Sequence, residues 1–96
     1  MRDEQWYRRH LAACGVPVHM HDAYIRYLLA GLEPGGFLVA VLANDLRAAV
    51  QRADTMNQHT LAAHINFLCT AAPAAAWGSY AHVQGWVAVM TASPAP

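Results

Sequence analysis

Apolar residues recur along this chain at the three- and four-residue spacing that places side chains on one face of an α-helix. The spacing predicts helices over residues 3–14, 22–30, 36–54, 55–71 and 80–90. We therefore expect an all-α fold, a compact small domain of four or five helices. In the last of these segments a strand over residues 86–89 is the alternative, because Gly85 weakens the helical propensity there.

Turn-forming residues separate the predicted helices. Gly15 and Gly31 are suited to end the first two helices, because glycine readily adopts the left-handed conformation found after a helix C-terminus. Pro17 favours an extended connector over residues 16–21. Ser79 is suited to cap the N-terminus of the last helix.

The junction between the third and fourth predicted helices allows two interpretations. Asp54 and Thr55 can cap a new helix, which favours a kink or short break at this point. A helical stripe also passes straight through the junction, so one continuous helix is the alternative. The stripe consists of Val50, Asp54, Asn57, Leu61, Ile65 and Leu68.

Two charged residues stand out on the predicted helix over residues 36–54. Asp45 and Arg52 lie two turns apart near the edge of its apolar face. Charges in such a position cost free energy unless they are paired or bind a ligand. One hypothesis is an ion pair, within the chain or between subunits. The other is a pocket in which Arg52 grips a phosphate or carboxylate bidentately, while Asp45 accepts from a ribose hydroxyl or a base N–H.

Several other residues would extend such a pocket. The Gly35-Gly36 loop precedes a helix, so its backbone N–H groups can hold a phosphate, although a turn between helices needs glycine in any case. Trp77 beside the Ser79 cap offers either a stacking plate or an ordinary core side chain. The full set of candidate ligand-binding residues is Gly35, Gly36, Asn44, Asp45, Arg52, Asp54, Asn57, Trp77 and Ser79.

Length and composition indicate a single domain over residues 1–96. Twenty of the 96 residues are Ala, which bury little area each, so we expect the chain to complete its core as a homodimer or higher oligomer. Residues 1–15 are a candidate N-terminal appendage helix, and residues 92–96 are expected to be a disordered tail. Asp22 and Arg26 have the spacing of an i,i+4 ion pair.

The net charge limits the classes of binding partner that we expect, and the cysteine content indicates the cellular compartment. The net charge is zero, which argues against broad binding to nucleic acids or membrane surfaces. All six basic residues are Arg, so an anion contact would use a planar guanidinium. Cys14 and Cys69 lie far apart in helical surroundings, a pattern typical of free thiols in a reducing cytosol. With no signal peptide apparent, we expect a cytoplasmic protein.

Signals for catalysis and metal binding are weak. His19 and His21 have no cluster of carboxylates or cysteines beside them to complete a metal site. His64 and Cys69 are five residues apart, so their directions on one helix diverge by about 140°. We therefore predict a protein that is not an enzyme, with no catalytic residue, no metal ion and no cofactor.

Four segments combine fixed polar and glycine positions in a specific pattern. They are PGGFLxAVLxNDL from Pro34, RADxxN from Arg52, Ala72-Pro73 and Trp77-Gly78-Ser79. This pattern resembles a family of short proteins encoded by bacteriophages and mobile elements. The resemblance covers roughly residues 16–86 and leaves the first predicted helix outside.

The resemblance implies a role but no settled activity. Short phage proteins of this size often counter host defence, so it implies a counter-defence binding protein. Our lead hypothesis is sequestration of a small nucleotide-like immune signal in the polar pocket. One alternative is a protein–protein inhibitor of a host defence effector, similar to anti-CRISPR proteins, which predicts a flat or convex apolar patch instead. Another alternative is a structural or accessory phage protein.

Overall fold

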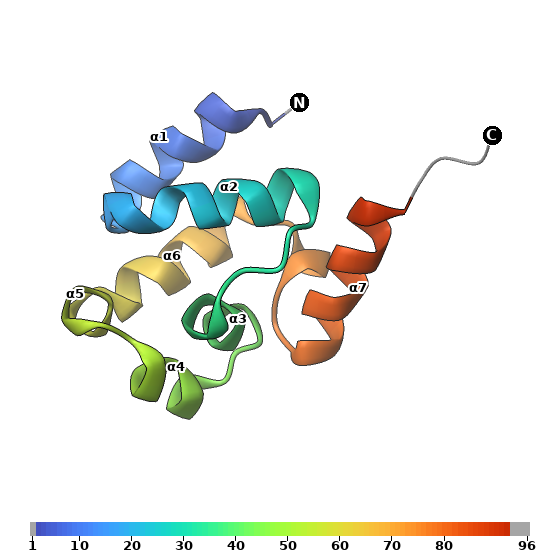
Figure 1. Ribbon diagram of the computed structural model, residues 1–96. Helices are drawn as coiled ribbons and strands as arrows, with labels where there is room; N and C mark the ends of the chain where they lie inside the picture. Colours follow the sequence, from blue (N-terminus) through green and yellow to red (C-terminus); the bar gives the residue numbers. More distant parts are fainter. Residues whose placement is uncertain (1, 93–96) are drawn as a thin grey trace.

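The computed structural model describes residues 2–92 as an arrangement of short helices (Figure 1). The described part of the chain contains no strand, so the all-α prediction is confirmed. The predicted number of helices is wrong, because two of the expected helices are each broken in two. The elements of residues 2–92 are α1 (Glu4–Cys14), η1 (Val18–Met20), α2 (His21–Ala30), α3 (Gly36–Leu42), α4 (Leu46–Arg52), α5 (Thr55–His59), α6 (Leu61–Ala71), η2 (Ala74–Ala76) and α7 (Tyr80–Thr91), where η marks a 3₁₀ helix.

Hydrogen bonds and dihedral angles confirm several of the predicted helix ends. Gly15 and Gly31 follow α1 and α2 with φ angles of 83° and 68°, the left-handed conformation that favours glycine. The Ser79 hydroxyl oxygen accepts a backbone N–H in the first turn of α7 at 3.0 Å. The Asp54 carboxylate accepts the N–H of Asn57 at 2.7 Å, so the chain does break before α5.

The helix predicted over residues 36–54 is interrupted at Asn44 and Asp45. Asn44 is left-handed, with φ at 62°, and the N–H groups of both residues bond back to carbonyls in the last turn of α3 at 3.1 and 2.9 Å. This arrangement ends α3 in the manner of a Schellman motif, with Asn in the usual place of Gly. The Asp45 side chain then accepts a backbone N–H at 3.1 Å and begins α4. Asp45 is therefore a helix cap, and not a charge on the face of a continuous helix.

Two other predicted segments differ from the structure. The helix expected over residues 55–71 is divided at Thr60, whose φ and ψ are −120° and 20°. Its hydroxyl donates to the carbonyl of Met56 at 2.9 Å, a local bond that competes with regular helix geometry. The connector expected over residues 16–21 is shorter than predicted, because η1 follows Pro17 directly and α2 begins at His21.

The hydrophobic core lies where α1, α2 and α6 pack together, with α3 and α7 closing it (Figure 1). Tyr7 and Leu11 of α1 are 4% and 0% exposed, so α1 is part of the packed domain and not an appendage to it. Residues 93–96 of the predicted tail lie outside the described residues. The largest fully buried side chains are Tyr24, Tyr27, Phe67, Leu11, Leu28, Leu38, Leu42, Leu68, His64 and Val83.

The C-terminal helix α7 is held against α2 by both polar and close apolar contacts. The indole N–H of Trp86 donates to the backbone carbonyl of Tyr27 at 3.0 Å. Gly31, at the end of α2, lies directly against Met90. A Cβ at Gly31 would collide with the Met90 side chain, so glycine is required there for both its φ and its size.

We predict that Gly31→Ala lowers the free energy of unfolding by about 2 kcal/mol or more, because it combines an unfavourable φ with this collision. Gly85→Ala in α7 is the matched control, since a new Cβ there meets no atom within 4 Å. Ala in place of Gly within a helix should stabilise it by about 0.5–1 kcal/mol. Urea unfolding followed by circular dichroism measures both effects. Equal stabilities for the two variants would contradict the packing of α7 on α2.

Candidate functional site

Five of the nine candidate residues line a single cavity of about 320 Å³. The cavity lies where η1 and the first turn of α2 meet the α2–α3 loop, the end of α4 and the start of α5. We name it the Arg52 pocket. Its lining residues are Met20, Ala23, Gly35, Gly36, Phe37, Leu38, Arg52, Asp54 and Asn57.

Arg52 lies along the glycine loop. A Cβ built on Gly36 would be 3.4 Å from the Arg52 Cδ and 3.7 Å from its Nη1, so glycine lets this side chain lie close to the backbone. Within residues 2–92, no carboxylate oxygen comes within 4.0 Å of the Arg52 guanidinium. Arg52 and Asp45 therefore do not form an ion pair within the chain, and the guanidinium donors are available to a ligand.

The second charged group of the pocket, Asp54, is already engaged. One carboxylate oxygen accepts the N–H of Asn57 at 2.7 Å, and the other lies 3.1 Å from Nε2 of His19. The hydrogen bond from Asn57 is the main cause that holds the pKa of Asp54 below its ordinary value, and His19 adds to it. Asp54 is therefore ionised at neutral pH, and its cap on α5 holds Asn57 at the pocket wall.

Asn57 connects the pocket to a buried chain of hydrogen bonds. Its Oδ1 lies 3.1 Å from Nε2 of His64, and Nδ1 of His64 lies 2.6 Å from the hydroxyl of Tyr24. With the Tyr24 hydroxyl as donor to Nδ1, His64 carries its proton on Nε2 and donates it to the Asn57 carbonyl oxygen. The Asn57 amide nitrogen then points at the thioether sulfur of Met20, at 3.4 Å, a weak acceptor.

His64 and Tyr24 are not among the candidate residues of the pocket that the sequence predicts. Neither belongs to the helical stripe that contains Asn57. Both side chains are 0% exposed. Burial lowers the pKa of His64 to about 4 and raises the pKa of Tyr24. The seven-residue interval from Asn57 to His64, two helical turns, was the signal that could have linked them.

The neutral state of His64 should make the stability of the fold depend on pH. An unfolded-chain His titrates near 6.5, whereas the pKa of His64 is about 4 in the fold, so the unfolded chain binds more protons between these values. The contribution of neutral His64 to the free energy of unfolding is therefore complete above about pH 6.5, and it is lost as the pH falls toward 4. For His64 alone we expect a loss on the order of 2 kcal/mol between pH 7 and pH 5.

Urea unfolding of the protein and of His64→Phe at pH 7 and pH 5 measures this effect. The substitution costs stability at both pH values, because it leaves Tyr24 and Asn57 without a partner. Only the change between the two pH values is compared, since the other histidines are common to both proteins. The variant should lose less stability on acidification. Equal losses would show that His64 does not stay neutral in the fold.

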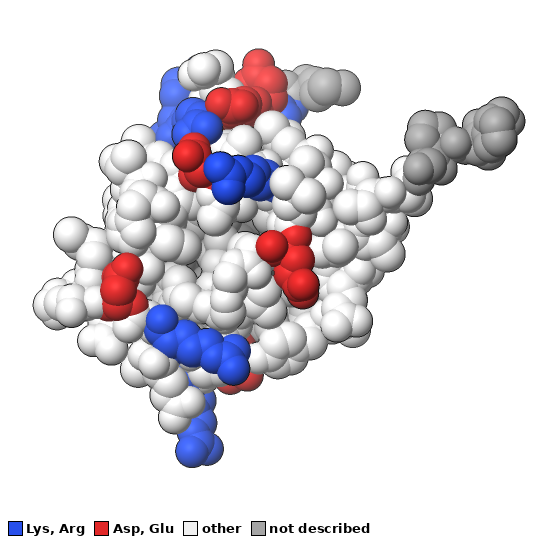
Figure 2. All heavy atoms as spheres, in the orientation of Figure 1, with Lys and Arg blue, Asp and Glu red and all other residues white. Residues whose placement is uncertain are grey.

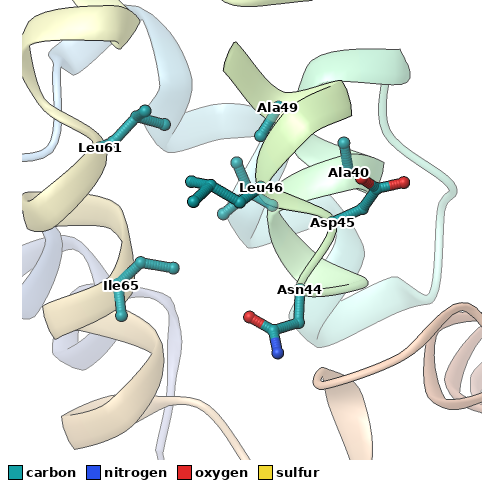
Figure 3. Close-up of a pocket in the computed structure, with 8 residues that line it drawn as sticks. Ala40, Asn44, Asp45, Leu46, Ala49, Leu61 and Ile65 are labelled. Atoms are coloured by element: carbon teal, nitrogen blue, oxygen red, sulfur yellow. The ribbon is translucent and has the colours of Figure 1, made fainter.

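Asn44 and Asp45 lie at a different cavity, of about 160 Å³, between α3, α4 and α6. We name it the α4–α6 pocket. In Figure 3, Leu61 and Ile65 of α6 face Leu46 across the gap, while the Asp45 carboxylate points away from α6. The lining is mainly apolar and consists of Ala40, Val41, Asn44, Asp45, Leu46, Ala49, Leu61 and Ile65.

The Asp45 carboxylate is used within the fold. The hydroxyl of Tyr80 donates to it at 2.6 Å, and the N–H of Ala48 donates at 3.1 Å. These bonds, that from Tyr80 first, hold the pKa of Asp45 below its ordinary value. Asp45 thus joins the start of α4 to the start of α7, and it does not line the Arg52 pocket.

Trp77 and Ser79 are also absent from the lining of the Arg52 pocket. Ser79 caps α7, and Trp77 is half-buried against the hydrophobic core. Between them, the N–H of Gly78 donates to the carbonyl of Leu42 at 2.7 Å. This turn therefore ties α7 to the end of α3. The packing of Trp77 agrees with its interpretation as a core side chain and not as a stacking plate in the pocket.

The remaining histidine and cysteine candidates do not converge. Nε2 of His21 lies 2.8 Å from the carbonyl oxygen of Val16, and His19 is bound to Asp54. Across residues 2–92, no group of three or more His, Cys, Asp or Glu side chains is placed to hold a metal ion. None of the helices described is both long and apolar enough to cross a membrane.

Comparison with known proteins identified no relative of this chain. No protein-family model, curated protein or solved structure matches the chain. The function is therefore inferred from the chemistry of the Arg52 pocket and of the apolar surface around the α4–α6 pocket.

Proposed function

We propose that this chain is a binding protein that takes a small nucleotide-like ligand, with a phosphate of that ligand on Arg52. The observation that carries the proposal is the convergence on one cavity of the glycine loop and of Arg52 and Asn57, which lie at the end of α4 and in α5. A guanidinium binds phosphate through two parallel N–H donors, and such charge-assisted bonds are among the strongest in proteins.

Asn57 supplies the second recognition element. The residue is 3% exposed, and the carbonyl oxygen of its side chain accepts a hydrogen bond from His64. The amide nitrogen has only the Met20 sulfur to donate to, so a carbonyl or ring nitrogen of a base offers it a better acceptor. Met20 has a flexible side chain that can give way to such a group.

The pocket is suited to binding rather than to catalysis. None of its lining residues is a Ser, Thr, Cys, Lys, Tyr or His. The one carboxylate, Asp54, has a lowered pKa and two hydrogen-bond partners, which makes it a poor general base at neutral pH. Its cavity of about 320 Å³ lies at the small end of the range for ligand pockets, so it suits one nucleotide unit.

The biological role that we propose is sequestration of a nucleotide immune signal of the host. This part of the proposal rests on the resemblance of residues 34–46 and 52–57 to phage and mobile-element proteins. Sequestration requires tight binding without turnover, which agrees with the lining described above.

Substitution of Arg52 tests the proposal. We expect Arg52→Ala to weaken binding of a nucleotide phosphate about tenfold or more, because a bidentate charge-assisted contact is lost. Arg47→Ala is the matched control, since Arg47 is exposed on the same helix and does not line the pocket. Calorimetric titration with mononucleotides, cyclic dinucleotides, cyclic trinucleotides and ADP-ribose measures the affinities. Equal losses in the two variants would refute a specific role for Arg52.

A thermal-shift screen first shows which nucleotide binds, so that its affinity can be compared between the two arginine variants. At a ligand concentration of about 100 times Kd, binding adds about 2.7 kcal/mol to stability. For a domain of this size, the midpoint of thermal unfolding should rise by roughly 10–20 °C. No shift with any nucleotide in the panel would exclude the proposed function.

An apolar surface favours a second candidate function, binding to another protein chain. Leu46, Val50 and Ile65 are 69%, 42% and 37% exposed, and Leu46 and Ile65 line the α4–α6 pocket. Leu46 and Val50 are one turn apart on α4, so they share a face. An exposed apolar surface of this kind is typical of protein–protein contacts. It suits either the expected homo-oligomer or an inhibitor that docks on a host defence effector.

We predict self-association through this surface. Light scattering should give a mass well above the 10.5 kDa of one chain, and Leu46→Asp should reduce it to that of a monomer. Val89→Asp is the matched control, because Val89 is 71% exposed on α7 and does not line the α4–α6 pocket. A monomeric wild-type protein would contradict the prediction and favour a different protein as the occupant of this surface.

A further inference from the structure

We propose that the Arg52 pocket is one half of a longer groove that binds a dinucleotide, with one phosphate on Arg52 and the other on Arg26. The inference rests on the proposed function, since it assigns the class of nucleotide. It derives from a second cavity, of about 330 Å³, which we name the Arg26 cavity. Its lining residues are Ala23, Arg26, Leu32, Glu33, Pro34 and Gly35.

The two cavities are neighbours that share part of their lining. Ala23 of α2 and Gly35 of the α2–α3 loop line both of them. These two residues are the smallest that a wall can have, and a Cβ on Gly35 would meet no atom within 4 Å. Little side-chain bulk therefore stands where the two cavities meet, and we infer that an elongated ligand can extend from one into the other.

Arg26 is available to a ligand because its expected partner is bound elsewhere. The spacing of Asp22 and Arg26 predicts an ion pair, but the Asp22 carboxylate accepts from the Arg8 guanidinium at 2.9 Å. Glu33 lines the Arg26 cavity, yet no carboxylate oxygen within residues 2–92 lies within 4.0 Å of the Arg26 guanidinium. Within the described part of the chain, Arg26 and Arg52 are thus alike: each lines one of the two cavities and neither forms an ion pair.

Each half of the groove has the same pair of charges. The Arg26 cavity contains Glu33, and the Arg52 pocket contains Asp54. Figure 2 shows basic and acidic side chains interspersed around a hollow on this face of the molecule, without a large region of one sign. An Arg donor repeated once matches a ligand that repeats a phosphate.

A second phosphate on Arg26 would also lie near the negative charge of Glu33. This repulsion reduces the affinity gained from Arg26 but does not cancel it. The Glu33 side chain is exposed, so its repulsion is screened by solvent, whereas the contact with Arg26 is direct. Once the first nucleotide is bound, the second contact forms within the complex and at a high effective concentration. A dinucleotide should therefore bind about tenfold to a hundredfold more tightly than the matching mononucleotide.

Calorimetric titration of the full chain tests the inference with defined probes. They are AMP and GMP, the linear 5′-phosphorylated diadenylate and diguanylate, and the corresponding 3′,5′-cyclic dinucleotides. Each is titrated into the wild type, Arg26→Gln, Arg52→Gln and Arg47→Gln at one salt concentration, with folding checked by circular dichroism. Glutamine keeps most of the side-chain stem, and Arg26 and Arg52 are both exposed, so all variants should fold.

For the dinucleotides, we expect Arg26→Gln to remove the advantage over mononucleotides while leaving mononucleotide affinity unchanged. Arg52→Gln should weaken both ligands, and Arg47→Gln neither. The linear and cyclic probes show whether the ligand is an open or a closed dinucleotide. Tighter binding of either one than of the matching mononucleotide supports the groove. Equal affinities for mono- and dinucleotides, or an advantage that survives Arg26→Gln, would overturn this inference and leave the proposed function intact. Absence of binding by every probe would overturn both.

Discussion

The structure depends on one buried chain of hydrogen bonds, from the Tyr24 hydroxyl through the His64 imidazole to the Asn57 amide. These three groups come from α2, α6 and α5, and all are nearly or fully buried. Because a buried polar group without a partner is costly, each one fixes the position of the next. The chain thus joins the packed core to a side chain that faces the Arg52 pocket, and it determines which end of the Asn57 amide a ligand would meet.

The breaks between the short helices position the residues of the Arg52 pocket. A continuous helix over residues 36–71 would not allow Asp54 to cap α5 with its carboxylate, a contact that brings Asn57 to the pocket wall. The breaks at Asn44 and at Ala53 instead turn α4 so that Arg52 reaches back to the glycine loop. The helix ends, more than the helix faces, therefore position the residues of the site.

The sequence was sufficient for the fold class and for several helix ends. Gly15, Gly31 and Ser79 act as caps through local chemistry that needs no tertiary information. The Asn44-Asp45 pair contained the same kind of signal, a left-handed former followed by an N-cap, but the apolar periodicity on both sides of it suggested one helix. Here the capping residues, and not the periodicity, indicated the true helix boundary.

The sequence anticipated which neighbouring residues share a cavity, but it did not anticipate hydrogen-bond partners from distant elements. Arg52, Asp54 and Asn57 lie close in sequence and share the pocket with the glycine loop. Asp45 was paired with Arg52 because of helical spacing, but its carboxylate bonds to Tyr80, 35 residues away. Asp22 likewise binds Arg8, 14 residues away, and this tertiary contact leaves Arg26 without an ion-pair partner among residues 2–92.

The two surfaces differ in the chemistry that they offer. The proposed groove from Arg26 to Arg52 combines carboxylates with two guanidinium groups that form no ion pair within residues 2–92, and it is balanced in charge. Such a lining would favour a defined small anion over general attraction to polyanions. The surface around Leu46 and Ile65 is apolar and favours contact with a protein. These surfaces use separate residues of α4, so the two kinds of binding can be separated by substitution.

The most direct test of the central claim is an NMR titration that observes the side-chain nitrogens of the Arg52 pocket. On addition of AMP or GMP, we predict shifts of the Arg52 Nε–H and Asn57 Nδ2 signals at the same ligand concentration, with the Arg47 Nε–H signal unchanged. Because Asn57 is bonded to His64, the imidazole signals of His64 should respond as well. Shifts confined to Leu46, Val50 and Ile65, or no shifts at all, would contradict nucleotide binding in this pocket.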